Sequence, residues 1–392
     1  IWLFGNNWFG WRFPQVLMQV VALYLFFLIA RRFLGDRYGL GATVLLGLDT
    51  VFFIHGGALL IDMASFLFGF LALELYFRKR YGWSAASMGL AFLAREMSIF
   101  FFVTLAVYHL AANMNRQSIR SALKVGVKYT LVTLAVFGIL LWIYDVRWQM
   151  YSSMHITNIV NRNIVLDPAG NAVTTIITTS QSTSKEMIWN PVDHVLFIYR
   201  YHGPGGMVIK EPYRPYQYAW NWILPIHVSP NGTFSFDLFD WPTYFRVDVR
   251  TSSPKGSMHY IPIWYQAAGN PMLWYGVWPG LVALGFAFRR KAERLTATFM
   301  AGGFLSNYVP WLVQSVIVRR IGFNYYMIWT LPFSALAIAL FWKKLTVGPP
   351  TETQLGRKID MLKAKLGPFL AILQLGLALT YFLYVFPVRP MP

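Results

Sequence analysis

The sequence contains no cysteine and little charge. Of its 392 residues, 13% are charged and 56% are hydrophobic, whereas soluble domains carry about 25% charged residues. The lack of cysteine excludes disulfide bonds and thiolate metal sites. The low charge excludes an ordinary water-soluble enzyme and is typical of a protein that lies in a membrane.

Acidic residues are scarce relative to basic ones. There are 34 Lys and Arg residues against 16 Asp and Glu, which gives a net charge of +18. Such an excess is also found in proteins that bind nucleic acid. Here, however, the basic residues lie between apolar runs of about 20 residues, the length that crosses a bilayer. We therefore expect membrane lipid as a partner and no nucleic acid.

The apolar runs predict ten membrane spans and hence an all-α polytopic membrane protein. One run, Ser84–Ala94, is too short to cross a hydrocarbon core of about 30 Å alone. The ten runs are Pro14–Ala30, Leu40–Ile54, Asp62–Phe77, Ser84–Ala94, Met97–Ala111, Val125–Val146, Pro271–Phe288, Leu295–Val318, Phe323–Trp342 and Leu366–Phe386.

The basic residues predict the orientation of these spans. If the ten spans alternate, every basic cluster in a short loop faces one side, which is then cytoplasmic. Both ends of the sequence then face the other side. The expected location is the plasma membrane, or the endoplasmic reticulum if the source is eukaryotic.

Three regions follow from this pattern. Residues 1–146 form an N-terminal membrane bundle of about six spans, and residues 147–269 form one large non-cytoplasmic loop domain, with 173–179 expected as a strand. Residues 270–392 form a C-terminal bundle of about four spans, with a cytoplasmic interfacial helix near 351–365. A loop as long as 147–269 is usually functional.

Several charged residues are predicted to lie near the outer membrane boundary. These residues are Asp49, Asp62, Arg95, Arg319 and Arg320. Charged groups at such depths are costly and usually functional. Because guanidinium groups bind phosphate oxygens in a bidentate manner, the arginines suggest a phosphate site.

Each of these residues also has a structural interpretation. Arg319 and Arg320 could extend toward lipid headgroups, Arg95 could pair with the adjacent Glu96, and Asp62 could cap the helix that follows it. The residues alone leave both interpretations open.

The large loop is rich in aromatic residues, which either stack on sugars or form an interfacial belt. The histidines at 194, 202, 227 and 259 lack metal-ligand spacing, so no metal is predicted.

Six segments, in the same order along the chain, resemble the protein O-mannosyltransferase family. Asp49 and Asp62 match the spacing of two family Asp positions, and Arg95 stands where the family has Lys. Tyr326 stands where the family signature has His, and Gly57 stands where the family has Arg. The segments are 9–30, 48–62, 89–95, 201–222, 269–274 and 320–333.

The resemblance implies a GT-C-type bundle with one large external loop. It also implies an inverting, metal-independent transfer of a sugar, expected to be mannose, from a polyprenyl-phosphate donor to a protein Ser or Thr hydroxyl on the non-cytoplasmic side, with no further cofactor. Asp49 is expected to be structural. The implied phosphate-binding residues are Arg95, Arg319 and Arg320, and the implied sugar- or acceptor-site residues are Asp62, His202, Tyr325 and Tyr326.

The catalytic residue is not identified in this sequence. The family's catalytic acid lies in the loop after its first membrane helix, which is expected to precede Ile1. Two alternatives remain: a non-catalytic GT-C-like membrane subunit of a larger complex, and a transferase with a lipid or glycan acceptor. A transporter is less favoured, because only Asp49 comes close to the mid-bilayer among the ionisable residues.

Overall fold

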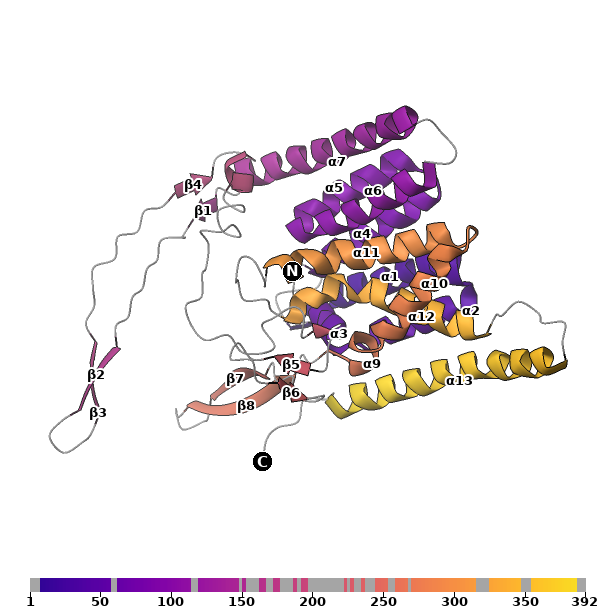
Figure 1. Cartoon of the computed structure of the whole chain (residues 1–392). Helices are drawn as coiled ribbons and strands as arrows, with labels where there is room; N and C mark the ends of the chain where they lie inside the picture. Colours follow the sequence, from indigo (N-terminus) through magenta and orange to yellow (C-terminus); the bar gives the residue numbers. More distant parts are fainter. Residues whose placement is uncertain are drawn as a thin grey trace. The chain divides into compact units, whose positions relative to one another are not determined.

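The fold was examined in a computed structural model (Figure 1). The structure describes residues 8–57, 62–113, 119–147, 150–152, 162–166, 172–176, 186–188, 192–196, 222–223, 226–228, 234–236, 244–252, 258–266, 269–314, 324–346 and 354–385. The chain divides into two compact units, residues 138–207 and the remainder, 1–137 with 208–392.

Helices account for most of the described residues. They are α1 (Trp8–Leu34), α2 (Asp36–Gly47), α3 (Thr50–Gly57), α4 (Asp62–Phe77), α5 (Tyr81–Ala94), α6 (Ile99–Asn113), α7 (Ile119–Arg147), α9 (Pro271–Trp274), α10 (Val277–Arg289), α11 (Arg294–Val313), α12 (Leu331–Thr346) and α13 (Gln354–Val385). Two 3-10 helices, η1 (Glu96–Ser98) and η5 (Asn324–Trp329), precede α6 and α12. This confirms the predicted all-α membrane architecture.

Five helical segments of the described chain are long and apolar enough to cross a membrane. They are Arg12–Leu34, Glu96–Asn113, Ile119–Arg147, Pro271–Arg289 and Ala364–Leu383, and they coincide with five of the ten predicted spans. Four of the other helices, α2, α4, α5 and α12, have 12 to 16 residues. That is shorter than the roughly 20 residues that a spanning helix needs.

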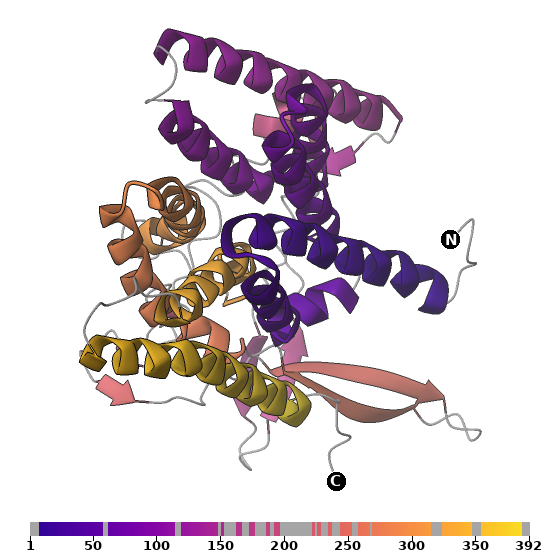
Figure 2. The same ribbon diagram turned by 90° about the vertical axis from the view of Figure 1, so that its right-hand side faces the viewer.

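Helix α12 forms the centre of its unit. Every residue from Leu331 to Leu340 is buried, and the helix contacts α2, α10, α11 and α13 (Figures 1 and 2). A helix that is apolar on all sides is typically buried against protein on all sides. Helices α7 and α13, by contrast, expose large apolar side chains such as Leu131 and Ile372, as expected of lipid-facing surfaces.

The predicted continuous span Leu40–Ile54 is wrong. The structure breaks it into α2 and α3 at Leu48 and Asp49. Asp49 Oδ1 accepts a hydrogen bond from the Phe52 backbone N–H at 3.0 Å, which caps the first turn of α3. Hydropathy does not detect this break, because the residues on both sides of it are apolar.

The region predicted as an interfacial helix is continuous with the last span. α13 runs from Gln354 through Pro368 to Val385 without interruption. Whether its first turns lie at the cytoplasmic interface stays a prediction.

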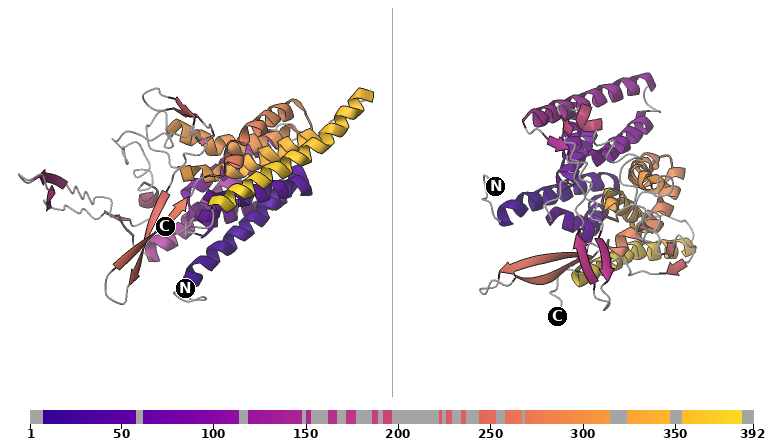
Figure 3. Two further views of the ribbon diagram at one scale, coloured as in Figure 1. Left: turned by 90° about the horizontal axis from the view of Figure 1, so that it is seen from below. Right: turned by 90° about the vertical axis from the view of Figure 1, so that its left-hand side faces the viewer.

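Among the described residues between 150 and 266, eight short strands pair as antiparallel two-stranded sheets. The pairs are β1 (Met150–Ser152) with β4 (Glu186–Ile188), β2 (Arg162–Leu166) with β3 (Ala172–Ile176), β5 (Ile226–Val228) with β6 (Phe234–Phe236), and β7 (Tyr244–Ser252) with β8 (Met258–Gln266). The predicted strand at 173–179 corresponds to β3. The longest pair, β7 and β8, is the twisted hairpin in Figure 3.

Candidate functional site

Asp49 is fully buried and saturated with protein hydrogen bonds. Besides capping α3, its Oδ2 accepts from the Asn270 backbone N–H at 2.9 Å and from Trp274 Nε1 at 2.8 Å. Protein N–H groups therefore supply donors to both oxygens of this buried carboxylate. Asp49 therefore links the break between α2 and α3 to α9.

The side chain of Asn270 extends this link. Its Nδ2 donates to Leu48 O and to Ala378 O, both at 3.0 Å, and its Oδ1 accepts from the Met272 N–H at 3.1 Å. The Gly-Asn-Pro-x-x-Trp segment at 269–274 thus joins α2, α9 and α13. The geometry agrees with the structural role expected for Asp49.

Asp62 and Arg95 form a buried ion pair. Asp62 begins α4, and Arg95 lies between α5 and η1; Asp62 Oδ1 and Arg95 Nη1 are 2.5 Å apart. The Asp62 side chain is 2% exposed and that of Arg95 is 17% exposed. Arg95 therefore pairs with Asp62 in this structure, in place of the pairing with Glu96 that adjacency suggested.

The turn that carries Arg95 is fixed by short-range contacts. Arg95 has an extended backbone, with φ −162° and ψ 135°. Ser98 in η1 donates to Ala91 O at 2.8 Å and is hydrogen-bonded to Ser65 on α4. Sequence reasoning missed both serines, because single Ser residues in apolar runs carry no recognisable pattern.

One side of the Arg95 guanidinium has an unused donor. Within the part of the chain that the structure describes, Arg95 Nε is buried without a hydrogen-bond partner. A buried guanidinium N–H without an acceptor costs free energy. An anionic ligand oxygen at this position would satisfy it.

Tyr326 lies in a buried aromatic stack. It is 8% exposed, and its ring stacks on Trp311 with centroids 4.3 Å apart and planes at 9°. Trp311 also packs edge-on against Phe100 in the first turn of α6, at 5.9 Å. Through Trp311, Tyr326 is connected to the helix that follows the Arg95 turn.

The other predicted site residues lie outside what the structure describes. Arg319, Arg320 and His202 fall outside the described ranges, and for Tyr325 only the backbone, in η5, is described. Of the predicted site, the structure thus brings Asp62 and Arg95 together. The predicted roles of all seven residues stay predictions.

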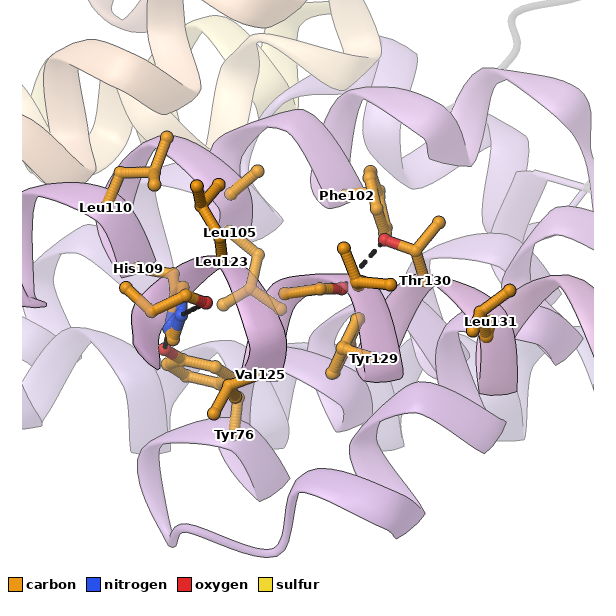
Figure 4. A pocket seen from close by; sticks show the side chains of 14 residues that line it. Tyr76, Phe102, Leu105, His109, Leu110, Leu123, Val125, Tyr129, Thr130 and Leu131 are labelled. Carbon is orange, nitrogen blue, oxygen red and sulfur yellow. Dashed lines mark hydrogen bonds between the residues drawn. The ribbon is translucent and has the colours of Figure 1, made fainter. Parts of the chain in front are cut away.

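An apolar pocket lies at the opposite end of α6 from Arg95. It has a volume of about 340 Å³ and is lined mainly by α6 and α7. In Figure 4, Tyr76 and His109 lie side by side at one end of it, with Tyr76 OH 2.5 Å from His109 Nδ1. His109 Nε2 also lies 3.0 Å from Ala122 O. With these polar groups engaged by protein, the pocket suits a hydrocarbon chain and not a sugar.

No group of three or more potential metal ligands occurs in the described residues. His194 Nδ1 instead lies 2.8 Å from Asp145 Oδ1, a two-residue pair within residues 138–207.

Comparison with known proteins shows which protein family the N-terminal part of the chain resembles. The model of the dolichyl-phosphate-mannose-protein mannosyltransferase family matches residues 1–142. No curated protein matches the chain. The matched region contains three of the six resembling segments, together with Asp49, Asp62 and Arg95. Residues 1–142 are therefore similar to the dolichyl-phosphate-mannose-protein mannosyltransferase family, and this match covers less than half of the 392-residue chain.

Proposed function

We propose that the protein transfers mannose from a polyprenyl-phosphate donor to a Ser or Thr hydroxyl of an acceptor protein on the non-cytoplasmic side of the membrane. The family match supports mannosyl transfer in general. The observation that carries the proposal for this chain is the Asp62–Arg95 pair, in which a buried guanidinium is held in place but keeps a free Nε donor.

The chemistry requires charge stabilisation at the departing phosphate. The acceptor oxygen forms a bond to the anomeric carbon, the bond from that carbon to the donor phosphate oxygen breaks, and polyprenyl phosphate leaves with the electron pair. Arg95, positioned by Asp62, hydrogen-bonds the phosphate oxygens as negative charge develops on them. Arg319 and Arg320 are proposed to join it.

The acceptor hydroxyl loses its proton to a general base, which is not assigned to a residue of this sequence. Asp62 is held by Arg95, so its proposed role is to position that guanidinium at the edge of the sugar site. His202, Tyr325 and Tyr326 are proposed to line the sugar or acceptor.

The test measures donor binding and transfer separately. The full-length protein in lipid nanodiscs is given polyprenyl-phosphate mannose and a Ser/Thr-containing peptide. We expect Arg95→Gln to lower the rate of transfer by about 100-fold, the usual effect of removing one donor to a developing oxyanion. The matched control is Arg120→Gln, which removes the charge of an exposed arginine in the first turn of α7 and is expected to transfer at the wild-type rate.

Three results would contradict the proposal in different ways. If Arg95→Gln transferred mannose at the wild-type rate, Arg95 would not be part of the phosphate site. Donor binding without transfer by the wild-type protein would favour a non-catalytic subunit. Transfer to a lipid or glycan but not to the peptide would contradict the protein acceptor.

A further inference from the structure

A second crevice combines an apolar wall with a basic rim. It lies between α10 and α12 and has a volume of about 350 Å³. Its lining residues are Val282, Ala283, Phe286, Arg289, Arg290, Phe341, Lys344 and Leu345. The basic residues are at the last turns of the two helices, which is where the candidate span Pro271–Arg289 ends. The crevice therefore lies at a membrane boundary, the one predicted to be cytoplasmic.

The two helices that form the crevice are held firmly together. A Cβ on Gly280 would lie 2.6 Å from the Ala337 carbonyl carbon, so the backbones of α10 and α12 touch at this glycine. Val282 and Phe286, two and six residues after Gly280, line the crevice and are exposed. The apolar wall is thus open to a hydrocarbon chain, and the packing at Gly280 fixes its shape.

The rim of the crevice has an excess of positive charge. Glu293 pairs with Arg290, at 3.6 Å, and with Lys344. Arg289 has no carboxylate partner within the described residues and lies over the Phe286 ring at 5.7 Å. Three cations therefore face one neighbouring carboxylate, and Arg289 is the cation left without an anion.

Lys344 is affected both by its partial burial and by the nearby charge of Arg290. Partial burial, and then the charge of Arg290, lower the pKa of the Lys344 ammonium from its ordinary value. A bound anion would offset both effects. This supports the geometry described above.

We infer that this crevice binds an anionic phospholipid, with its phosphate on the Arg289–Arg290–Lys344 rim and an acyl chain along Val282, Phe286 and Phe341. A free phosphate would use the rim alone, whereas the adjoining apolar wall favours a lipid. Basic pockets between membrane helices are typical sites for anionic headgroups. The site is separate from the Arg95 region and does not depend on the proposed reaction.

The test compares two neighbouring cations. Detergent-solubilised full-length protein is titrated with short-chain phosphatidylglycerol while its unfolding temperature is recorded. We expect Arg289→Gln to weaken the apparent affinity about five-fold. Lys291→Gln removes the same charge from an exposed residue two positions away that does not line the crevice, and it should leave the affinity unchanged. Arg289→Lys should retain most of it.

Phosphatidylcholine and glycerol 3-phosphate complete the experiment. The proposal expects weaker protection from both, because the first lacks net charge and the second lacks acyl chains. If Arg289→Gln and Lys291→Gln lost the same apparent affinity for phosphatidylglycerol, the site would be overturned, because the lipid would then be attracted by the general surface charge. Equal protection by phosphatidylcholine would overturn the charge recognition. Equal protection by glycerol 3-phosphate would overturn the lipid as occupant.

Discussion

Asp49 and Asp62 lie 13 positions apart in the family-matched region, and both are buried, but their surroundings differ in kind. Asp49 accepts hydrogen bonds from three N–H groups of the protein. Asp62 instead pairs with a guanidinium whose Nε has no acceptor within the described residues. The N–H donors around Asp49 thus all have a protein acceptor, whereas the Arg95 Nε donor has none among the described residues.

The comparison shows how burial alone misleads. An intramembrane carboxylate is usually taken as a functional residue, yet both oxygens of Asp49 accept hydrogen bonds from the protein itself. What distinguishes the two carboxylates is whether a hydrogen-bond donor near each one, such as Arg95 Nε near Asp62, lacks an acceptor among the described residues. Four substitutions test whether this distinction holds.

The largest effect is expected for Asp49→Ala. The substitution leaves the Asn270 N–H, Trp274 Nε1 and the Phe52 N–H without their acceptor, at about 1 to 3 kcal/mol for each buried group. We expect a loss of roughly 4 kcal/mol in the free energy of unfolding, measured by chemical denaturation in micelles. Asp36→Ala is the control, because the Asp36 side chain is 85% exposed. If the two variants lost the same amount of unfolding free energy, the proposed structural role of Asp49 would be wrong.

Arg95→Gln should follow, with a loss of about 3 kcal/mol in the free energy of unfolding, because it removes the guanidinium that pairs with the buried Asp62 carboxylate. The double variant Asp62→Asn/Arg95→Gln removes both charges and should recover most of the unfolding free energy. It should not recover mannose transfer, since the guanidinium that we propose binds the phosphate is still absent. Recovery of both quantities would show that the pair is structural only, as Asp49 is.

Trp274→Phe tests the Asp49 network from the donor side. Trp274 Nε1 donates to a carboxylate at 2.8 Å, whereas Trp278 Nε1 donates to the neutral Ile223 carbonyl at 2.7 Å. A hydrogen bond to a charged acceptor contributes about 2 kcal/mol, and one to a neutral acceptor about 1 kcal/mol. Thermal unfolding of Trp274→Phe and Trp278→Phe should show this order. The reverse order would mean that Asp49 does not stabilise the fold through α9.

The sequence allowed both Asp positions and Arg95 to be singled out, but not their partners. Asn270 and Trp274 lie more than 220 residues from Asp49, so no local pattern relates them. A pair between Arg95 and the adjacent Glu96 was one of two interpretations that the sequence left open. Adjacent side chains in extended backbone point in opposite directions, and the extended conformation of Arg95 directs it to Asp62.

Helix positions were easier to predict than helix ends. Apolar runs placed α1, α6, α7, α10 and α13, because hydropathy is a property of whole segments. The break at Asp49 coincides with one capping bond, and α13 continues through Pro368 although proline usually interrupts a helix interior. Neither changes the mean hydropathy, so neither was visible in the sequence.

The smallest and sharpest test removes one hydroxyl from each end of α4. Ser65 is hydrogen-bonded to Ser98 near Arg95, and Tyr76 is hydrogen-bonded to His109 in the apolar pocket. Ser65→Ala and Tyr76→Phe should each cost about 1 kcal/mol of unfolding free energy, since each leaves one buried polar partner unpaired.

The two variants should differ in their rate of mannose transfer. Ser65→Ala loosens the turn that positions Arg95 and should lower the rate about three-fold, because small misplacements of a catalytic group are amplified in the rate. Tyr76→Phe should transfer at the wild-type rate. Equal rates in the two variants would place the Arg95 turn outside the reaction, and a lower rate in Tyr76→Phe would move the functional region toward the pocket.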